Sequence, residues 1–408
     1  MTDTTDRSDT IDLTDSSDGF DLFDAAYVRD PAPQWQQFRE TCPVARSERY
    51  GGSWMPVRYD DIVAVARDHE RFSSAQGVSV IEVPDRKAAL ADGNPPIDAD
   101  PPLHGWTRRL LLGPMSPKAV ESYEAGTRAL CRRLIAGFAV TGRADAAADY
   151  AQQLPVRVIG ALLGVPEDRS DQFVGWVRSI LEFAHDGERR QRAMFELRDF
   201  LVEQLAERRA HPGDDMISAL LAAEVDGEPV ADSLIIGEAA LLMVAGVDTT
   251  WSAIGSALFH LASHPEDRHR LTTDPDVWPL AIEEFLRFYS PVTMARIATQ
   301  DAEIAGCPVH TGDRVLLNFP AANRDDSVFD DADTFVIDRD RNRHLAFGVG
   351  IHRCAGSNLA RMELRVALEE WMAAIPEFEL EDPGVVTWAG GQVRGPRSVP
   401  VRFAPIKA

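Results

Sequence analysis

The most apolar stretch of the chain runs from Leu234 to Phe259 and contains two acidic residues, Glu238 and Asp248. Asp248 lies near its middle, where a membrane-spanning helix would bear a large free-energy cost for a carboxyl group. A helix that is apolar on nearly all sides is instead buried inside a protein. The stretch therefore predicts a long core helix in a soluble protein.

Helical periodicity recurs along most of the chain. Examples are the segments 117–139, 148–164, 168–184, 188–209, 232–263, 278–289 and 356–375. Short strand signals are interleaved: a hairpin around Gly51-Gly52, strands over 296–319, and a last hairpin near 385–403 with Gly390-Gly391 at its turn. The pattern predicts a mainly α fold with a small β region.

The N-terminus differs from the rest of the chain. Aspartate recurs at every third position from Asp3 to Asp24, and residues 1–24 contain eight acids and one base. Such a segment buries little apolar surface, so residues 1–24 are expected to be an acidic, disordered tail. Residues 25–408 show no Pro- or Ser-rich linker in the middle and no internal repeat, which predicts a single domain.

The charge and the cysteines narrow the class of protein. Lys and Arg total 42 and Asp and Glu total 65, so the net charge is −23. Because an acidic surface repels phosphate backbones, no nucleic-acid partner is expected. No two of the four cysteines form a CxxC pair, and the first twenty residues have no apolar signal-peptide core. A cytoplasmic protein with reduced thiols and no membrane partner is expected.

The strongest motif is FGVGIHRCAG at residues 347–356, which an amphipathic helix follows. Cys354 lies just before that helix, where backbone N–H groups and the helix dipole favour a thiolate. Gly350 and Gly356 allow close approach of a flat group, and Phe347 shields it. Chance predicts roughly 0.001 matches to the spacing FxxGxxxCxG. The alternatives are a structural cysteine in a glycine-rich turn and the axial ligand of a haem iron.

The loop resembles the haem-binding signature of the cytochrome P-450 family, and further family motifs follow in order over essentially the whole chain after the tail. The resemblance implies the cytochrome P-450 fold, one haem-thiolate domain over residues 25–408, and haem b (iron protoporphyrin IX) as the cofactor. It also implies that Cys354 is the iron ligand and that Phe347, Gly348 and Gly356 contact the haem.

The segment Ala245-Gly-Val-Asp248-Thr249-Thr lies inside the apolar stretch and resembles the family's oxygen-activation motif. A buried acid is costly, and a helical threonine that bonds the i−4 carbonyl loosens the helix. The residues alone leave open a satisfied core acid beside a helix irregularity. The resemblance implies that Thr249 and Asp248 are catalytic, as hydrogen-bond donor to the oxygen molecule and as proton relay. Small Ala245 leaves room above the haem.

Glu284 and Arg287 form an ExxR pair on a predicted helix, where residues three apart share a face. Composition alone predicts roughly 2.4 such matches, so the motif depends on its position upstream of the cysteine loop. The resemblance implies a structural pair that holds the segment near residues 322–325. The family usually has proline after Asp325, where this chain has Asp326.

The two propionates of a buried haem need cationic partners. The resemblance implies that His104, Arg108, Arg296 and His352 supply them, and the HxxxR spacing places the first two on one helical face. Each residue alone is equally compatible with an ordinary surface position.

The resemblance places substrate-contacting residues in loops and on the long helix. The candidates are mainly aliphatic, as expected of a pocket for an apolar molecule, and ordinary core is the alternative for each. Gln392 is the obvious polar group. The absence of a cation among the candidates disfavours a small aromatic acid, although the alternative that Arg178 or Arg189 approaches from the helices predicted over 168–209 stays open. The candidates are Val78, Val80, Ile81, Leu241, Val244, Val292, Met294, Gln392 and Val393.

The resemblance implies a monooxygenase that hydroxylates or otherwise oxidises a small to medium apolar organic substrate with O₂ and two electrons. The chain has no GxGxxG or P-loop, so no nicotinamide or flavin site of its own is expected. Electrons are expected from a [2Fe–2S] ferredoxin with a separate NAD(P)H-dependent reductase. Ferredoxins are usually acidic, which predicts a basic docking patch of Arg108, Arg109, Arg353 and Arg361.

Two alternatives stay open. A peroxide-driven haem-thiolate peroxygenase would bypass the ferredoxin, although it would need no protons delivered through Asp248 and Thr249. A non-enzymatic haem- or ligand-binding protein, such as a sensor, would show no turnover, although no sensory or output domain accompanies the cysteine loop.

Overall fold

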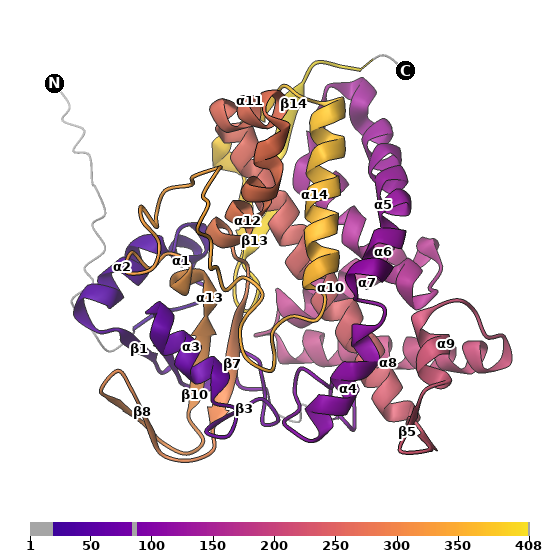
Figure 1. Ribbon diagram of the computed structural model, residues 1–408, viewed down its shortest axis with the longest axis vertical. Helices are drawn as coiled ribbons and strands as arrows, with labels where there is room; N and C mark the ends of the chain where they lie inside the picture. The colour runs from indigo at the N-terminus through magenta and orange to yellow at the C-terminus, as the bar shows by residue number, and fades with distance from the viewer. Residues whose placement is uncertain (1–18, 84–87, 407–408) are drawn as a thin grey trace.

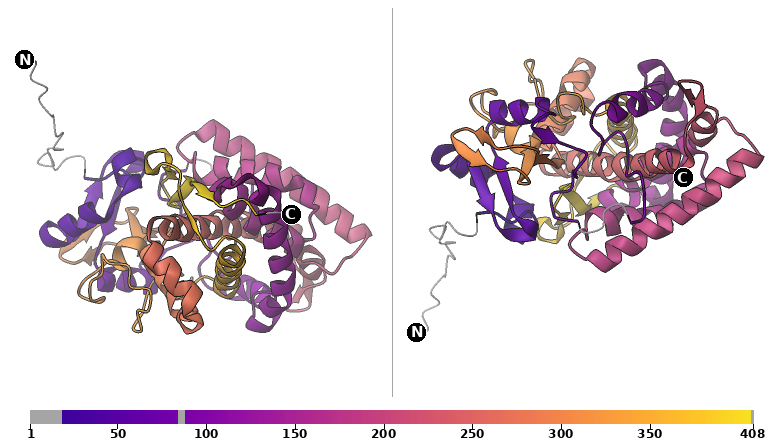
Figure 2. Two further views of the ribbon diagram at one scale, coloured as in Figure 1. Left: turned by 90° about the horizontal axis from the view of Figure 1, so that it is seen from above. Right: turned by 90° about the horizontal axis from the view of Figure 1, so that it is seen from below.

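The computed structural model describes residues 19–83 and 88–406. Helix α10 (Asp232–Ser263) crosses the centre of the molecule, and α6 to α9, α11, α12 and α14 contact it along its length (Figures 1 and 2). It is long and apolar enough to span a membrane, yet its buried residues lie on nearly all sides and include Glu238 and Asp248. The predicted core helix over 232–263 is confirmed.

The mainly α character predicted from the sequence is also confirmed. The helices are α1 (Ala25–Arg29), α2 (Ala32–Thr41), α3 (Tyr59–Arg67), α4 (Leu103–Leu112), α5 (Pro117–Phe138), α6 (Gln153–Leu163), α7 (Ser170–Leu181), α8 (Gly187–Ala210), α9 (Met216–Leu221), α11 (Pro265–Thr273), α12 (Trp278–Phe288), α13 (Phe319–Ala322) and α14 (Ser357–Ala374). Six of these helices, α5, α6, α7, α8, α12 and α14, correspond to segments predicted from the sequence. Most of their ends lie within a few residues of the predicted ends.

One predicted helix, over 148–164, is divided in the structure. A π-helical turn occupies Ala146–Ala151, and α6 begins only at Gln153. Pro155 has no N–H group to donate to the carbonyl four residues earlier, so an uninterrupted α-helix cannot pass through this point. The irregular turn packs against α10, which keeps it inside the core.

The β region forms one five-stranded sheet in the order β1-β2-β10-β7-β3 and several smaller sheets. All neighbours in the larger sheet are antiparallel except β2 and β10, which are parallel. The strands are β1 (Val44–Ser47), β2 (Ser53–Pro56), β3 (Phe72–Ser73), β4 (Arg143–Asp145), β5 (Glu224–Val225), β6 (Glu228–Pro229), β7 (Thr293–Ala298), β8 (Ala302–Ile304), β9 (Cys307–Val309), β10 (Arg314–Asn318), β11 (Phe378–Leu380), β12 (Thr387–Ala389), β13 (Gly395–Ser398) and β14 (Pro400–Phe403).

The hairpins predicted around residues 51–52 and 385–403 are both present, but their connections differ from the predicted two-residue turns. Strands β1 and β2 pair, but a 3₁₀ turn over Arg49–Gly51 joins them in place of a two-residue Gly-Gly turn. Strands β12 and β13 form the last hairpin, whereas β14 leaves it to pair with β11 and β4. In Figure 1 the larger sheet lies with α1 to α3 on one side of α10, opposite α5 to α9.

The predicted tail is too long. Residues 1–18 lie outside the described residues, but residues 19–24 pack onto the domain, and Phe20 and Leu22 are only 4% and 5% exposed. The carbonyl of Phe20 accepts a hydrogen bond from Ser47 Oγ at 2.8 Å, and that of Leu22 accepts one from the Gly391 N–H at 2.9 Å. The prediction of a disordered tail is wrong for residues 19–24, because apolar residues between the aspartates find a place in the core.

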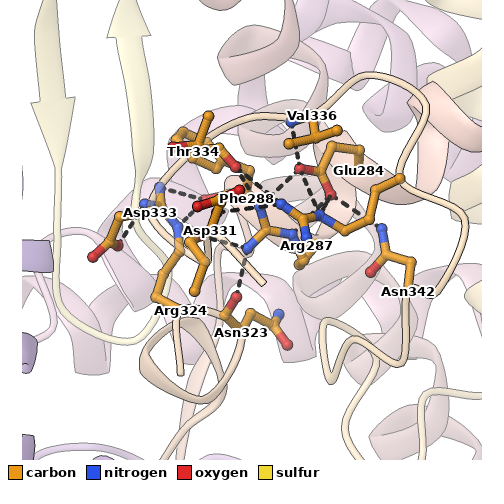
Figure 3. Close-up of polar contacts among 12 residues, drawn as sticks. Glu284, Arg287, Phe288, Asn323, Arg324, Asp331, Asp333, Thr334, Val336 and Asn342 are labelled. Atoms are coloured by element: carbon orange, nitrogen blue, oxygen red, sulfur yellow. Dashed lines mark hydrogen bonds and ion pairs between the residues drawn. The ribbon is translucent and has the colours of Figure 1, made fainter. Parts of the chain in front are cut away.

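A buried ion pair on α12 joins distant parts of the chain (Figure 3). Arg287 and Glu284 are fully buried, and Arg287 Nη2 lies 2.7 Å from Glu284 Oε1. Arg287 also donates to the backbone carbonyls of Asn323, Ala332 and Thr334 at 2.7–2.9 Å. The guanidinium therefore fixes the irregular chain after α13 to α12.

The carboxylate of Glu284 has three further donors (Figure 3). It accepts hydrogen bonds from the Val336 N–H at 2.8 Å, from Arg339 Nε at 3.1 Å and from Asn342 Nδ2 at 3.2 Å. Buried charges are tolerated only when paired and hydrogen-bonded, and both members of this pair meet that condition. The Glu284 carboxylate, like the Arg287 guanidinium, thus holds the irregular segment that leads into the loop over residues 347–356.

We expect Arg287→Ala to lower the free energy of unfolding by about 3–5 kcal/mol, because Glu284 would remain as an uncompensated buried charge. Arg402→Ala is the control, since its ion pair with Glu379 is 58% and 62% exposed and such pairs contribute at most about 1 kcal/mol. Urea unfolding followed by circular dichroism measures both. Equal losses in the two variants would contradict a special role for the α12 pair.

Candidate active site

Cys354 ends the loop over residues 347–356, directly before α14. Its N–H donates to the Phe347 carbonyl at 2.8 Å, which closes the loop on itself. A Cβ at Gly356 would lie 4.0 Å from Cys354 Sγ, so that position leaves the sulfur uncovered. A Cβ at Gly350 would lie 2.7 Å from the Ala66 carbonyl of α3, so packing on α3 by itself requires a glycine at this position.

The thiol of Cys354 is accessible although many protein atoms surround it. Burial raises the pKa of the Cys354 thiol, while the Gly356 N–H and the guanidinium of Arg108 act in the opposite direction. The sequence-based expectation of a lowered thiol pKa is therefore wrong for the protein alone. A bound metal ion would favour the thiolate, because coordination deprotonates a thiol outright.

Four cationic or basic side chains gather on the side of the loop that faces α4 and β7. The rings of His104 and His352 are 4.4 Å apart, and the Nε2 atom of each is buried without a hydrogen-bond partner among the described residues. Arg296 is 4% exposed, and among the described residues its side chain donates a hydrogen bond to the carbonyl of Ala295 alone. Arg108 on α4 donates to the Arg353 carbonyl.

The burial and the lowered pKa values of these basic side chains fit the binding of an anion from outside the chain among them. Burial lowers the pKa of His352 to about 2, with Arg296 and His104 adding to the shift. Burial likewise lowers the pKa of Arg296 to about 10. Within the described part of the chain no carboxylate forms an ion pair with any of the four. Because buried cations require anionic partners, the two propionates of a haem fit this place, next to the Cys354 thiol.

Helix α10 provides a partly accessible face in its central part. Leu241, Val244, Ala245 and Thr249 are half-buried, whereas most of the residues between them are buried. Thr249 Oγ1 donates to the carbonyl of Ala245 at 2.8 Å, one turn earlier. This hydroxyl competes with the helix's own hydrogen bonds, which loosens the turn and leaves an adaptable polar group on that face.

Asp248 lies beside Thr249 and is 1% exposed. Its Oδ1 atom is 2.9 Å from Arg397 Nη2 of β13, although these two atoms are not aligned as a hydrogen bond. Burial raises the pKa of Asp248 to about 6, and Arg397 opposes the shift. A carboxyl group that titrates close to neutral pH can both take up and release protons.

Arg397 connects Asp248 to the end of α7. Its Nε atom lies 3.2 Å from Glu182 Oε2, and its Nη1 atom donates to Ser252 Oγ at 3.2 Å. Glu182 in turn pairs with Arg178 at 2.8 Å. The sequence analysis missed Arg397 and Glu182 because no motif marks them. The only available signal was that a buried Asp248 needs a cation from elsewhere in the chain.

The predicted substrate-contacting residues divide into three groups. Val78 and Ile81 line a cavity of about 580 Å³, whereas Val80 is buried in a core cluster with Ala295. Leu241 and Val244 lie on the half-buried face of α10.

The third group comes from β7 and the last hairpin. Val292 and Val393 pair as an isolated β-bridge. Gln392 Nε2 lies 3.3 Å from the sulfur of Met294. These four residues are brought together although they are far apart in the sequence, and Gln392 remains their polar member.

Comparisons with known proteins agree with this architecture. A family model described as cytochrome P-450 matches residues 170–387. The chain is 35% identical over 379 residues to the mycinamicin IV hydroxylase/epoxidase of Micromonospora griseorubida, which covers 91% of this chain and 95% of that protein. It is 33% identical over 386 residues to a steroid C26-monooxygenase of Mycobacterium tuberculosis (92% and 94%).

A solved structure of a cytochrome P-450 has the same fold as this chain. The cytochrome P-450 PksS of the bacillaene polyketide synthase of Bacillus subtilis 168 superimposes with a TM-score of 0.86 at 29% identity. The match covers 94% of this chain and 100% of that one. The fold predicted from the sequence is confirmed, and the chain belongs to the cytochrome P-450 family.

Proposed function

We propose that Cys354 ligates the iron of haem b in this monooxygenase, and that His104, Arg108, Arg296 and His352 hold the propionates. The supporting observation is that the exposed residue Cys354 lies next to four basic side chains that form no ion pair with a carboxylate in the described part of the chain. We assign residues 19–408 to a single haem-thiolate domain. The soluble domain and the reduced thiols support a cytoplasmic location.

The haem, when bound, activates O₂ so that one oxygen atom enters an apolar organic substrate and the other becomes water. The chain's own residues position the substrate and deliver protons. The half-buried face of α10 with Leu241, Val244 and Ala245 borders the substrate, and Thr249 presents a hydroxyl there. Asp248 is the next residue along the helix, and because burial raises its pKa to about 6, it takes up and releases protons near neutral pH and supplies them toward Thr249.

Electrons come from a separate redox partner, for which we propose a [2Fe–2S] ferredoxin and an NAD(P)H-dependent reductase. Of the predicted basic patch, Arg361 is paired with Glu283 at 2.6 Å, and Arg108 is turned inward onto the Arg353 carbonyl. Arg109 and Arg353 are exposed, without an ion pair among the described residues. These two cations form the docking patch.

An apolar residue adjoins the docking patch. Leu112 is 45% exposed and lies three residues after Arg109, on the same face of α4. A cation next to an exposed apolar side chain suits an interface in which charge guides the encounter and apolar contact holds the complex.

Cys354→His tests the iron ligand. In the wild-type protein, reduced under carbon monoxide, the Soret band is expected at the wavelength from which the family takes its name, because a thiolate donates strongly to iron. The histidine variant should retain haem and lose that band. Cys42→Ser, at an exposed cysteine outside the loop, should keep it. If the Cys354 variant keeps the band, the ligand assignment is wrong.

Thr249→Ala tests the proton path. Loss of the hydroxyl should divert oxygen to hydrogen peroxide, so that product formed per NAD(P)H consumed falls several-fold while substrate binding stays within about twofold. Thr250→Ala, at a buried neighbour, is the control. Product and peroxide are measured together in one turnover assay. Unchanged coupling in Thr249→Ala would remove Thr249 from the mechanism.

Arg109→Glu tests the docking patch. Reversal of an exposed interface charge mainly slows association, so the rate of reduction by ferredoxin should fall about tenfold at low salt and converge with wild type at high salt. Stopped-flow reduction measures this rate. Arg402→Glu, at an exposed arginine paired with Glu379, provides the control. A rate that is independent of both substitution and salt would rule out this patch.

A further inference from the structure

Arg190 on α8 is an arginine without a partner. Its guanidinium forms no hydrogen bond or ion pair in the part of the chain that the structure describes, although the residue is only half-exposed. Burial lowers the pKa of Arg190, and no acid counteracts the shift. An arginine cannot relieve this situation by losing its proton, because its pKa stays far above neutral.

The buried acids of the protein offer a contrast. Glu238 and Glu363 also lack cation partners, and burial raises the pKa of each to about 8. They are therefore protonated and neutral at pH 7, which removes the need for a counter-ion. Arg190 cannot become neutral in this way, so its charge is compensated either by solvent at its exposed part or by an anion from outside the chain.

Arg190 lines a cavity of about 580 Å³, a size typical of ligand pockets. The same cavity is lined by Val78 and Ile81, which the sequence analysis placed at the substrate, and by Met194 and Ile297. Ile297 follows Arg296 on β7, and the Ala295 N–H donates to the Val78 carbonyl at 3.0 Å. The cavity thus reaches β7 on the face opposite to Arg296, because successive side chains of a strand point to opposite faces.

The other charged residues of the cavity are already engaged. Asp98 accepts a hydrogen bond from the Asn94 N–H at 2.9 Å. Glu82 raises the pKa of Arg314, which burial lowers, so these two residues offset each other across the cavity wall. Arg190 is the one lining cation that no described acid compensates.

We propose that Arg190 binds a carboxylate of the substrate, so that the protein oxidises apolar carboxylic acids. The guanidinium takes the carboxylate as a two-pronged hydrogen-bond donor, and Val78, Ile81, Met194 and Ile297 contact the apolar part. The inference rests on the proposed function, since it treats the cavity as part of the path to Cys354. The sequence-based argument disfavoured a small aromatic acid because no cation was among the pocket candidates, and Arg190, next to the Arg189 considered there, supplies one.

The test compares acids with their neutral methyl esters on the purified haem-loaded protein. Pairs of a medium-chain fatty acid and its ester, and of a cyclic terpenoid acid and its ester, are titrated by the substrate-induced change of the haem absorption spectrum. Because a hydrogen bond to a charged group corresponds to about tenfold or more in affinity, the acid of at least one pair should bind about tenfold more tightly than its ester.

Variants assign the preference to one side chain. Arg190→Gln should remove the tenfold preference and leave ester affinity within twofold, and Arg190→Lys should restore part of it. Arg192→Gln is the matched control, since Arg192 lies two residues away on the same helix and lines a different groove with Gln172 and Glu196. It should behave as wild type.

The outcomes separate this inference from the proposed function. If esters change the spectrum and no acid is preferred, or if Arg190→Gln keeps the preference, the carboxylate site is wrong while the monooxygenase assignment stands. If the reduced protein lacks the family's carbon monoxide band, the proposed haem ligation itself fails. Equal loss of preference in Arg190→Gln and Arg192→Gln would show only a general charge effect and would also overturn the site.

Discussion

A charge buried in a helical core must be compensated, and this requirement organises the whole molecule. Glu284 and Arg287 compensate each other completely and use their remaining donors and acceptors to hold backbone from several segments. The irregular chain between α13 and α14 has little regular hydrogen bonding of its own. Its position, and with it the position of the loop that ends at Cys354, depends on that pair.

The buried charge of Asp248 on α10 is only partly compensated. Asp248 lies close to Arg397, but the ion pair is poorly aligned, and burial still raises the pKa of Asp248 to about 6. A fully compensated acid would hold its charge and could not exchange a proton near neutral pH. Incomplete compensation is therefore compatible with catalysis, whereas the complete compensation at Glu284 suits a structural role.

Much of this arrangement was predictable from the sequence because it depends on local patterns. The apolar stretch around Asp248 predicts α10, and the spacing around Cys354 identifies the loop, since both signals lie within a few turns of chain. Burial of Phe20 and Leu22 was not predictable, because an aspartate at every third position masks their contribution. The contact between Asp248 and Arg397 depends on the packing of β13 against α10, and no local sequence pattern predicts that packing.

Absence of a partner is most informative for groups that cannot change their charge. Glu238 and Glu363 become neutral by protonation, so their isolation costs little and implies no ligand. Arg296 and Arg190 remain cationic, and Arg190 lines a cavity that a ligand can enter. In our proposals, anions from outside the chain compensate both charges: a haem propionate at Arg296 and a substrate carboxylate at Arg190.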